Sequence, residues 1–355
     1  MADKTANGQP PVLSIKNLKT FFFTDLGVSR ALNGVILDIP HGKVMGLVGE
    51  SGCGKSVTAL SIMRLVPKPG EIVAGSIVFN RGERVDGRYV VSESIEMTEL
   101  EVNGPLVRSI RGNNMAMIFQ EPMTSLNPSY TVGNQVAETI ILHQEVSRAE
   151  AMNRAIEIVT HVGLPNPQQI VKRYPHELSG GMRQRAMVAL ALSCRPTILF
   201  ADEPTTALDV TTEAQILDLM RELQDEMGMT IVFITHNLGV VAQTCDTVGV
   251  MYLGRIVELA SVDDIFYDPK HPYTSALLRS IPHVGSRTKA RLAPIHGVVP
   301  DPYTTVSGCP FHPRCDSFMP GVCDVAAPAR HDLGDGHLVR CFLYSDQVEV
   351  EDNGN

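Results

Sequence analysis

The chain has 355 residues, of which 44% are hydrophobic and 19% charged, and its formal net charge is −9. These proportions are typical of an ordered globular protein and exclude a disordered one, and the length favours one large domain with an appendage, or two domains. The acidic balance, without a long run of Lys or Arg, argues against nucleic acid as a partner. No run of about 18 apolar residues is present that could span a bilayer.

The N-terminal residues MADKTANGQPP lack the apolar core of a signal peptide, which indicates a cytosolic protein.

The sequence that follows predicts short strands. Short strands are expected at residues 12–15, 35–39 and 44–48, where apolar and β-branched residues are frequent. Residues 81–110 are polar and weakly periodic, so we expect a surface insertion or an irregular strand region there.

A glycine-rich loop follows the strand at 44–48. Its sequence fills every position of the phosphate-loop pattern GxxxxGK[ST], with Gly49, Glu50, Ser51, Gly52, Cys53, Gly54, Lys55 and Ser56. In this pattern the glycines turn backbone N–H groups toward phosphate oxygens, the lysine reaches the terminal phosphates and the hydroxyl can hold Mg²⁺. A helix can continue from Val57, and its N-terminus favours phosphate. We therefore expect a nucleoside triphosphate site, the alternative being a glycine-rich turn without a ligand.

The middle of the chain alternates between helices and strands. From about residue 131 to 192 the apolar residues recur at helical spacing. Two nearly all-apolar strands follow at 197–201 and 230–234, with a helix between them. Alternation of this kind indicates a parallel sheet with crossover helices. Pro and Gly become frequent around residues 282–308, where we place a domain boundary.

Two adjacent carboxylates, Asp202 and Glu203, end the first of these buried strands. There an Asp is placed to hold Mg²⁺ and the Glu beside it can polarise an attacking water. An Asp-Glu pair taken alone usually marks only the solvent-exposed end of a strand, which is the alternative here. Gln120 follows the apolar residues 115–118, and His236 follows the strand that ends at Thr235. Neither residue carries a functional signal by itself.

The sequence LSGGMRQR opens a helix at residues 178–185. Ser179 can cap this helix, and Gly180 and Gly181 leave N–H groups that could meet an anion. A capped helix start without a ligand is the alternative.

Taken in chain order, the phosphate loop, Gln120, the LSGGM sequence, Asp202-Glu203 and His236 resemble the ATP-binding subunit of an ABC transporter, over roughly residues 12–345. Within that family the chain is similar to the oligopeptide/dipeptide/nickel importer group. The sequences that carry this similarity lie at 120–128, 202–210, 271–274 and 308–315. Met182, where Gln is commoner, resembles the DppD/OppD type of subunit.

The resemblance implies an α/β fold: a P-loop ABC ATPase with a mixed or parallel sheet core and an antiparallel β subdomain. It also implies a helical subdomain at about 121–192 and a small Cys-rich C-terminal extension. The nucleotide-binding domain would span residues 12–281 and the extension residues 282–345.

The resemblance also implies a role for each site residue, with ATP and Mg²⁺ as cofactors. Glu203 would be the general base, and His236, Gln120 and Lys55 would complete the catalytic set. Ser56, Gln120 and Asp202 would hold Mg²⁺. Residues 49–57, ending at Val57, would cradle the phosphates, and Phe22 is favoured for stacking on adenine. Ser179, Gly180 and Gly181 would complete the ATP site of the opposite subunit.

Four cysteines, Cys309, Cys315, Cys323 and Cys341, crowd the C-terminal part of the chain. This Pro-rich segment has few apolar residues for a core of its own, so a metal is expected to hold it together. The spacing lacks a Cys-x2-Cys pair, and four thiolates suit either Zn²⁺ or an iron–sulfur cluster. The resemblance implies a [4Fe–4S] cluster. Four unligated thiols are the alternative, and His312 or His337 could replace a thiolate.

The function implied by the resemblance is an ATPase that powers import of di- or oligopeptides or similar small solutes. Its partners would be a second ATPase subunit such as a DppF- or OppF-like paralogue, two membrane permease subunits and an extracytoplasmic solute-binding protein, with no nucleic acid. It would lie at the cytoplasmic face of the inner membrane. A soluble non-transport ABC ATPase is disfavoured by the single phosphate loop and the lack of heptads. A redox- or metal-sensing ATPase is a further alternative.

Overall fold

The computed structural model describes residues 10–85, 88–120, 125–206, 208–280 and 295–349. Contacts within the chain define two compact units. Unit 1 comprises Met1–Pro40, Met45–Thr98 and Thr235–Asn355, and unit 2 comprises His41–Val44 and Glu99–Ile234.

Unit 1 contains the phosphate loop and the C-terminal part of the chain. Its first elements are β1 (Leu13–Thr24), β2 (Gly27–Ile39), β3 (Val44–Val48), α1 (Lys55–Ile62), β4 (Gly70–Val85), β5 (Arg88–Glu96) and η1 (Met97–Glu99). Its later elements are α9 (Leu238–Thr244), β9 (Thr247–Tyr252), β10 (Arg255–Ser261), α10 (Val262–Tyr267), α11 (Pro272–Arg279), η3 (His312–Arg314), β11 (His331–Asp332) and β12 (Leu338–Val339).

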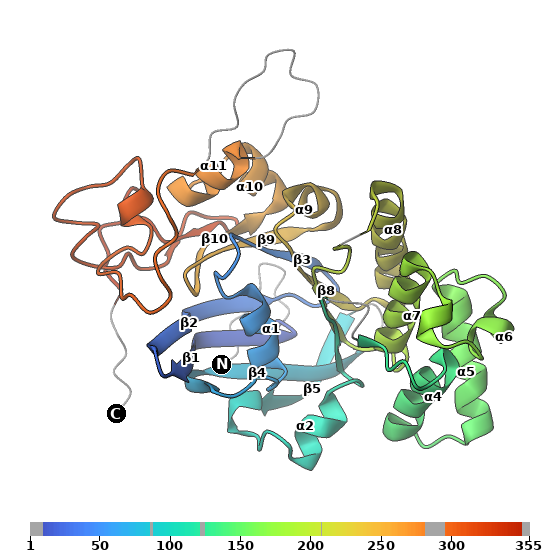
Figure 1. Cartoon of the computed structure of the whole chain (residues 1–355). Helices are drawn as coiled ribbons and strands as arrows, with labels where there is room; N and C mark the ends of the chain where they lie inside the picture. The colour runs from blue at the N-terminus through green and yellow to red at the C-terminus, as the bar shows by residue number, and fades with distance from the viewer. Residues whose placement is uncertain (1–9, 86–87, 121–124, 207, 281–294, 350–355) are drawn as a thin grey trace, which may run out of the picture. The chain divides into compact units, whose positions relative to one another are not determined.

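Two sheets organise unit 1. The first is antiparallel, in the order β2-β1-β4-β5. In the second, β11, β12, β10, β9 and β3 are successive neighbours; β3 runs parallel to β9, and the other pairs are antiparallel. Every residue of β3 is buried, as expected of a strand covered on both faces. Figure 1 shows α10 and α11 beside β9 and β10, next to the red C-terminal segment.

The antiparallel sheet differs from the expectation at two places. The strands expected at 12–15 and 35–39 are the ends of β1 and β2, which have 12 and 13 residues. The surface insertion or irregular strand region expected at 81–110 is only partly confirmed: residues 81–85 and 88–96 belong to the paired strands β4 and β5, whose register shifts between Arg81 and Gly82, and Pro105–Ile110 form α2 in unit 2. Backbone pairing stabilises these two strands, and Tyr89 links them by donating from its hydroxyl to Asn80 O over 3.0 Å.

Unit 2 contains a parallel sheet and a group of helices. Its elements are α2, β6 (Met115–Ile118), α4 (Val132–His143), α5 (Arg148–His161), α6 (Pro167–Ile170), η2 (Pro175–Glu177), α7 (Gly180–Leu192), β7 (Ile198–Asp202), α8 (Val210–Met227) and β8 (Thr230–Ile234). The strands run parallel in the order β8-β7-β6. Figure 1 shows α4 to α7 gathered into one group of helices.

Local sequence explains where these helices begin and end. Side-chain oxygens of Thr131, Ser147 and Asp209 accept hydrogen bonds from the first turns of α4, α5 and α8. α8 ends at Gly228, whose φ of 64° suits a residue without a side chain. Within the described ranges no helix is both long enough and apolar enough to cross a bilayer.

Candidate functional site: a phosphate loop and a paired carboxylate

The phosphate loop connects β3 to α1, in the strand–loop–helix arrangement expected from its sequence. Two of its glycines are required by the backbone. At Gly49, φ is +150° and a Cβ atom would lie 2.2 Å from Met251 O. At Gly54, φ is +107° and a Cβ atom would lie 2.5 Å from Ala31 O. The loop can therefore keep this shape only with glycine at these positions.

Lys55 is 7% exposed and lies inside the loop. Its Nζ donates to Gly49 O over 2.8 Å and to Glu50 O over 3.0 Å. Lys55 is also the first residue of α1, and the N-cap residue Gly54 has no side chain that could cap the helix. A buried ammonium group beside an uncapped helix N-terminus fits a phosphate group. The residues present thus suit the triphosphate of ATP, and the Ser56 hydroxyl next to Lys55 is a suitable oxygen ligand for Mg²⁺.

Unit 1 also contains His236 and Phe22. His236 is exposed and directly precedes Asn237, which caps α9. Phe22 lies in β1 and pairs with Gly70 of β4. A Cβ atom on Gly70 would lie only 2.6 Å from the Phe22 ring, so the ring packs directly over this glycine. Its neighbour Phe21 has the Arg30 guanidinium 5.8 Å from its ring centroid.

Unit 2 holds the two adjacent carboxylates. Asp202 is the last residue of β7 and is 6% exposed. Glu203 follows with φ of +45°, which is uncommon for a residue with a side chain. Its backbone N–H donates to Ile234 O over 2.8 Å, which fixes this turn to the end of β8. Strained backbone of this kind is concentrated at functional sites.

Gln120 lies against Glu203. Gln120 Nε2 donates to Glu203 Oε2 over 2.8 Å, and Thr206 Oγ1 donates to the same oxygen over 3.1 Å. The structure thus brings together two residues that the sequence separates by 83 positions. A carboxylate held in one orientation by two donors is suited to act on a water molecule.

The LSGGM sequence begins α7 as expected. Ser179 Oγ accepts a hydrogen bond from Met182 N over 3.4 Å, and a Cβ atom on Gly180 would meet open space. Gln184, which the sequence did not single out, is fully buried in this helix and donates to Pro204 O, one residue after Glu203. Gln184 therefore links α7 to the turn that carries Glu203.

The prediction of a [4Fe–4S] cluster, or of Zn²⁺, on the four C-terminal cysteines is wrong. Among the residues that the structure describes, no group of three or more His, Cys, Asp or Glu side chains is arranged to hold a metal ion. All four cysteines are free. Burial raises the pKa of Cys309 to about 12 and that of Cys341 to about 11, which favours the thiol over the thiolate that a metal binds.

Packing against β9, β10 and α11 of the same unit holds this segment, residues 295–349, together instead. Phe311 is 2% exposed, and its ring centroid lies 5.3 Å from those of Tyr252 and Tyr273. His337 Nε2 lies 2.8 Å from Oε1 of Glu258, a buried carboxylate of β10. A metal was expected because the segment itself has few apolar residues. The structure shows that the segment shares a core with β9, β10 and α11.

Tyr273, in α11, is a residue of the site that sequence analysis missed. Its hydroxyl accepts a hydrogen bond from the backbone N–H of Glu50 over 2.9 Å, so α11 contacts the phosphate loop directly. Burial raises the pKa of this phenol and keeps it neutral. The only sequence signal was its position in the HPYT stretch, whose role periodicity alone does not reveal.

Comparison with known families decides the identity of the chain. Residues 32–206, which include the phosphate loop and Glu203, match the family described as ABC transporter. Residues 257–323 match the oligopeptide/dipeptide transporter C-terminal region. A probable peptide ABC transporter ATP-binding protein of Sinorhizobium fredii is 48% identical over 96% of this chain and 97% of its own length. The chain belongs to the ABC transporter ATP-binding family.

Other relatives agree with this assignment. The dipeptide transport ATP-binding protein DppD of Bacillus subtilis is 44% identical, over 95% of this chain and 96% of its own length. Among solved structures, the ATP-binding cassette MJ0796 bound to ADP and phosphate is 26% identical and superposes with a TM-score of 0.59, over 70% of this chain and 98% of its own. The expected P-loop ATPase fold is confirmed, and as a member of this transporter family the chain is an ATPase.

Proposed function

We propose that the chain energises the import of dipeptides, oligopeptides or similar small solutes. The observation that carries this proposal is the match of residues 257–323 to the oligopeptide/dipeptide transporter C-terminal region, in a chain that is 44–48% identical to relatives named for peptide transport. The two-domain division at residue 281 and the C-terminal extension at 282–345 are part of the same proposal. Neither alternative function has a comparable observation in its favour.

In this proposal each site residue has the role that its chemistry suits. Lys55 and residues 49–57 hold the phosphates, Ser56, Gln120 and Asp202 hold Mg²⁺, and Phe22 stacks on adenine. Glu203 is the general base, and Gln120 and His236 contact the reacting end of the nucleotide. Bound Mg²⁺ supplies charge neutralisation for phosphoryl transfer. The buried ammonium of Lys55 and the hydrogen bond between Gln120 and Glu203 support these assignments.

The proposed working unit is a pair of ATPase subunits docked on two permease subunits at the cytoplasmic face of the membrane. Ser179, Gly180 and Gly181 would complete the ATP site of the partner, a paralogous subunit of the DppF or OppF kind. ATP then favours the closed pair because its charge needs donors from both sides, and hydrolysis releases it. An extracytoplasmic binding protein would deliver the solute.

Solute uptake by cells tests this proposal. A strain that lacks the gene for this chain would be complemented with the native chain or with Glu203→Gln, and uptake of a labelled dipeptide, a labelled pentapeptide, nickel and a labelled oligosaccharide would be compared. The proposal predicts peptide uptake that only the native chain restores. Restoration of nickel or oligosaccharide uptake alone, or peptide uptake with the Gln variant, would contradict it.

A further inference from the structure

An ion pair joins the C-terminal segment to the phosphate loop. Arg314 donates from one terminal nitrogen to Glu50 Oε2 over 2.7 Å and from the other to Glu50 Oε1 over 3.0 Å. The Arg314 side chain is 3% exposed and that of Glu50 is 24% exposed. A bidentate pair between a guanidinium and a carboxylate fixes both groups in orientation as well as in position.

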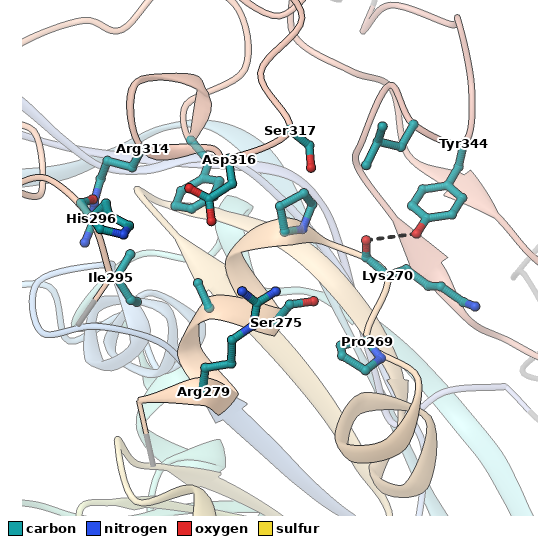
Figure 2. Close-up of a pocket in the computed structure, with 14 residues that line it drawn as sticks. Pro269, Lys270, Ser275, Arg279, Ile295, His296, Arg314, Asp316, Ser317 and Tyr344 are labelled. Atoms are coloured by element: carbon teal, nitrogen blue, oxygen red, sulfur yellow. Dashed lines mark hydrogen bonds between the residues drawn. The ribbon is translucent and has the colours of Figure 1, made fainter. Parts of the chain in front are cut away.

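The rest of the Arg314 side chain is also held. Its Nε donates to His296 O over 3.0 Å, and one terminal nitrogen lies 3.4 Å from the Tyr252 hydroxyl. Arg314 lines a cavity of about 280 Å³. Figure 2 shows Arg314 beside His296, with Arg279 of α11 on another part of the lining. Contacts from β9 and from the C-terminal segment therefore hold the guanidinium in position, in addition to its contact with the phosphate loop.

Glu50 is the second residue of the phosphate loop, and its backbone is fixed as well. Its N–H donates to the Tyr273 hydroxyl, and its carbonyl oxygen accepts from Lys55 Nζ and, over 3.3 Å, from Cys53 N. The carboxylate of Glu50 is therefore anchored in the loop that the triphosphate would occupy. A negative charge at this place opposes the binding of a polyanion unless a cation compensates it.

We propose that Arg314 is a positioning residue for ATP: it neutralises the Glu50 carboxylate and holds the phosphate loop in the shape that receives the triphosphate. Loss of the cation leaves an uncompensated carboxylate in the loop, whereas loss of the carboxylate leaves only a cation near a polyanion. The two single variants break the same ion pair, yet only the loss of the cation is expected to weaken ATP binding. This inference concerns ATP binding and does not depend on which solute is carried.

The test uses the full chain with Arg314→Gln, Glu50→Gln, the double variant and Arg330→Gln. Arg330 is exposed in the same C-terminal segment, so its variant is a control that removes the same charge. Equilibrium binding of ATP would be measured by calorimetry, and amide hydrogen exchange would be measured in a peptide covering residues 45–56 without nucleotide. A charge coupling of this kind is expected to change affinity by about fivefold or more.

We expect Arg314→Gln to weaken ATP binding by at least that factor and to speed exchange in the loop. Glu50→Gln should bind ATP as tightly as the native chain or more tightly, and the double variant should recover most of the lost affinity. Arg330→Gln should leave both measurements unchanged. Equal weakening in both single variants, no recovery in the double variant, or native affinity in Arg314→Gln would overturn the proposal. If the single Arg314 variant folds poorly, the double variant still tests the proposal, because it contains neither charge of the ion pair and so leaves no charge unpaired.

Discussion

Gln120 donates a hydrogen bond to Glu203 over 2.8 Å, although β6 and β7 carry these two residues to the site from distant parts of the sequence. The pair joins a residue expected to hold Mg²⁺ to the carboxylate expected to act as the base. Because Thr206 holds the same carboxylate oxygen, the Glu203 side chain has a defined orientation before any ligand arrives. Orientation of this kind lowers the barrier to the step that the carboxylate catalyses.

Replacing Gln120 tests this arrangement. In Gln120→Ala the carboxylate loses the hydrogen bond from Gln120, so we expect kcat for ATP hydrolysis to fall by about tenfold, equivalent to about 1.4 kcal/mol of transition-state stabilisation. Phosphate release at saturating ATP measures the change. Gln135→Ala is a matched control, because in the described part of the chain that amide bonds loop backbone at Asn127 and Tyr130. A kcat for Gln120→Ala within twofold of the native value would refute the role of the pair.

A comparison of Ser179 with Ser147 distinguishes helix capping from a role in the ATP site. Each caps a helix of unit 2 through its hydroxyl, and each Ser→Ala change should lower the free energy of unfolding by about 1 kcal/mol. Only Ser179→Ala should also reduce ATP hydrolysis in the assembled pair of ATPase subunits, because only that residue belongs to LSGGM. Chemical denaturation and phosphate release measure the two effects. Equal hydrolysis in the two variants would leave Ser179 with a capping role alone.

His271 predicts a pH dependence of stability. Burial lowers the pKa of His271 to about 3, whereas imidazole in an unfolded chain titrates near 6.5. Between these values the unfolded state binds one more proton, so the free energy of unfolding falls as the pH is lowered, by about 2 kcal/mol at pH 5 for this group. Urea unfolding at pH 7.5 and pH 5 measures the change.

The control for that measurement is His271→Asn. An Asn at this position does not titrate, and it can still accept the hydrogen bond that His271 Nδ1 accepts from Tyr273 N. Its pH dependence should therefore be smaller than that of the native chain by about the same 2 kcal/mol. The same pH dependence in both proteins would show that His271 is not buried in its neutral form.

Phe311 tests how the C-terminal segment is held. Because its ring packs on Tyr252 and Tyr273, Phe311→Ala should lower the free energy of unfolding by about 3–5 kcal/mol. Phe318, 38% exposed in the same segment, provides the control, and its Ala variant should cost less than about 1 kcal/mol. A similar small loss in both variants, together with a large loss on adding a chelator, would contradict packing as the main stabilising contribution.

The buried strands, the phosphate loop and the start of α7 could be predicted from the sequence, each for a physical reason. β7 and β8 are buried along their whole length, so they appear as uninterrupted apolar runs. The phosphate loop was predictable because its glycines are imposed by close backbone contacts at Gly49 and Gly54. Ser179 was recognisable as a cap from local sequence alone.

Features that depend on contacts between distant residues were not predictable. The paired parts of β4 and β5 at residues 81–85 and 88–96 are mostly polar, so no alternation identified them as paired strands. The cysteines were interpreted as metal ligands because the sequence does not show that Phe311 enters a core built by Tyr252 and Tyr273. The pair of Arg314 and Glu50 joins residues 264 positions apart, and neither has a distinctive local pattern.

If this chain hydrolyses ATP with Glu203 as the base, Glu203→Gln is the decisive variant. ATP binding and phosphate release would be measured on the same preparation of the native and variant chains in the assembled transporter. We expect the variant to bind ATP with native affinity but to release phosphate at least about 100-fold more slowly, as is usual when a general base is removed. Phosphate release at the native rate would contradict the assignment.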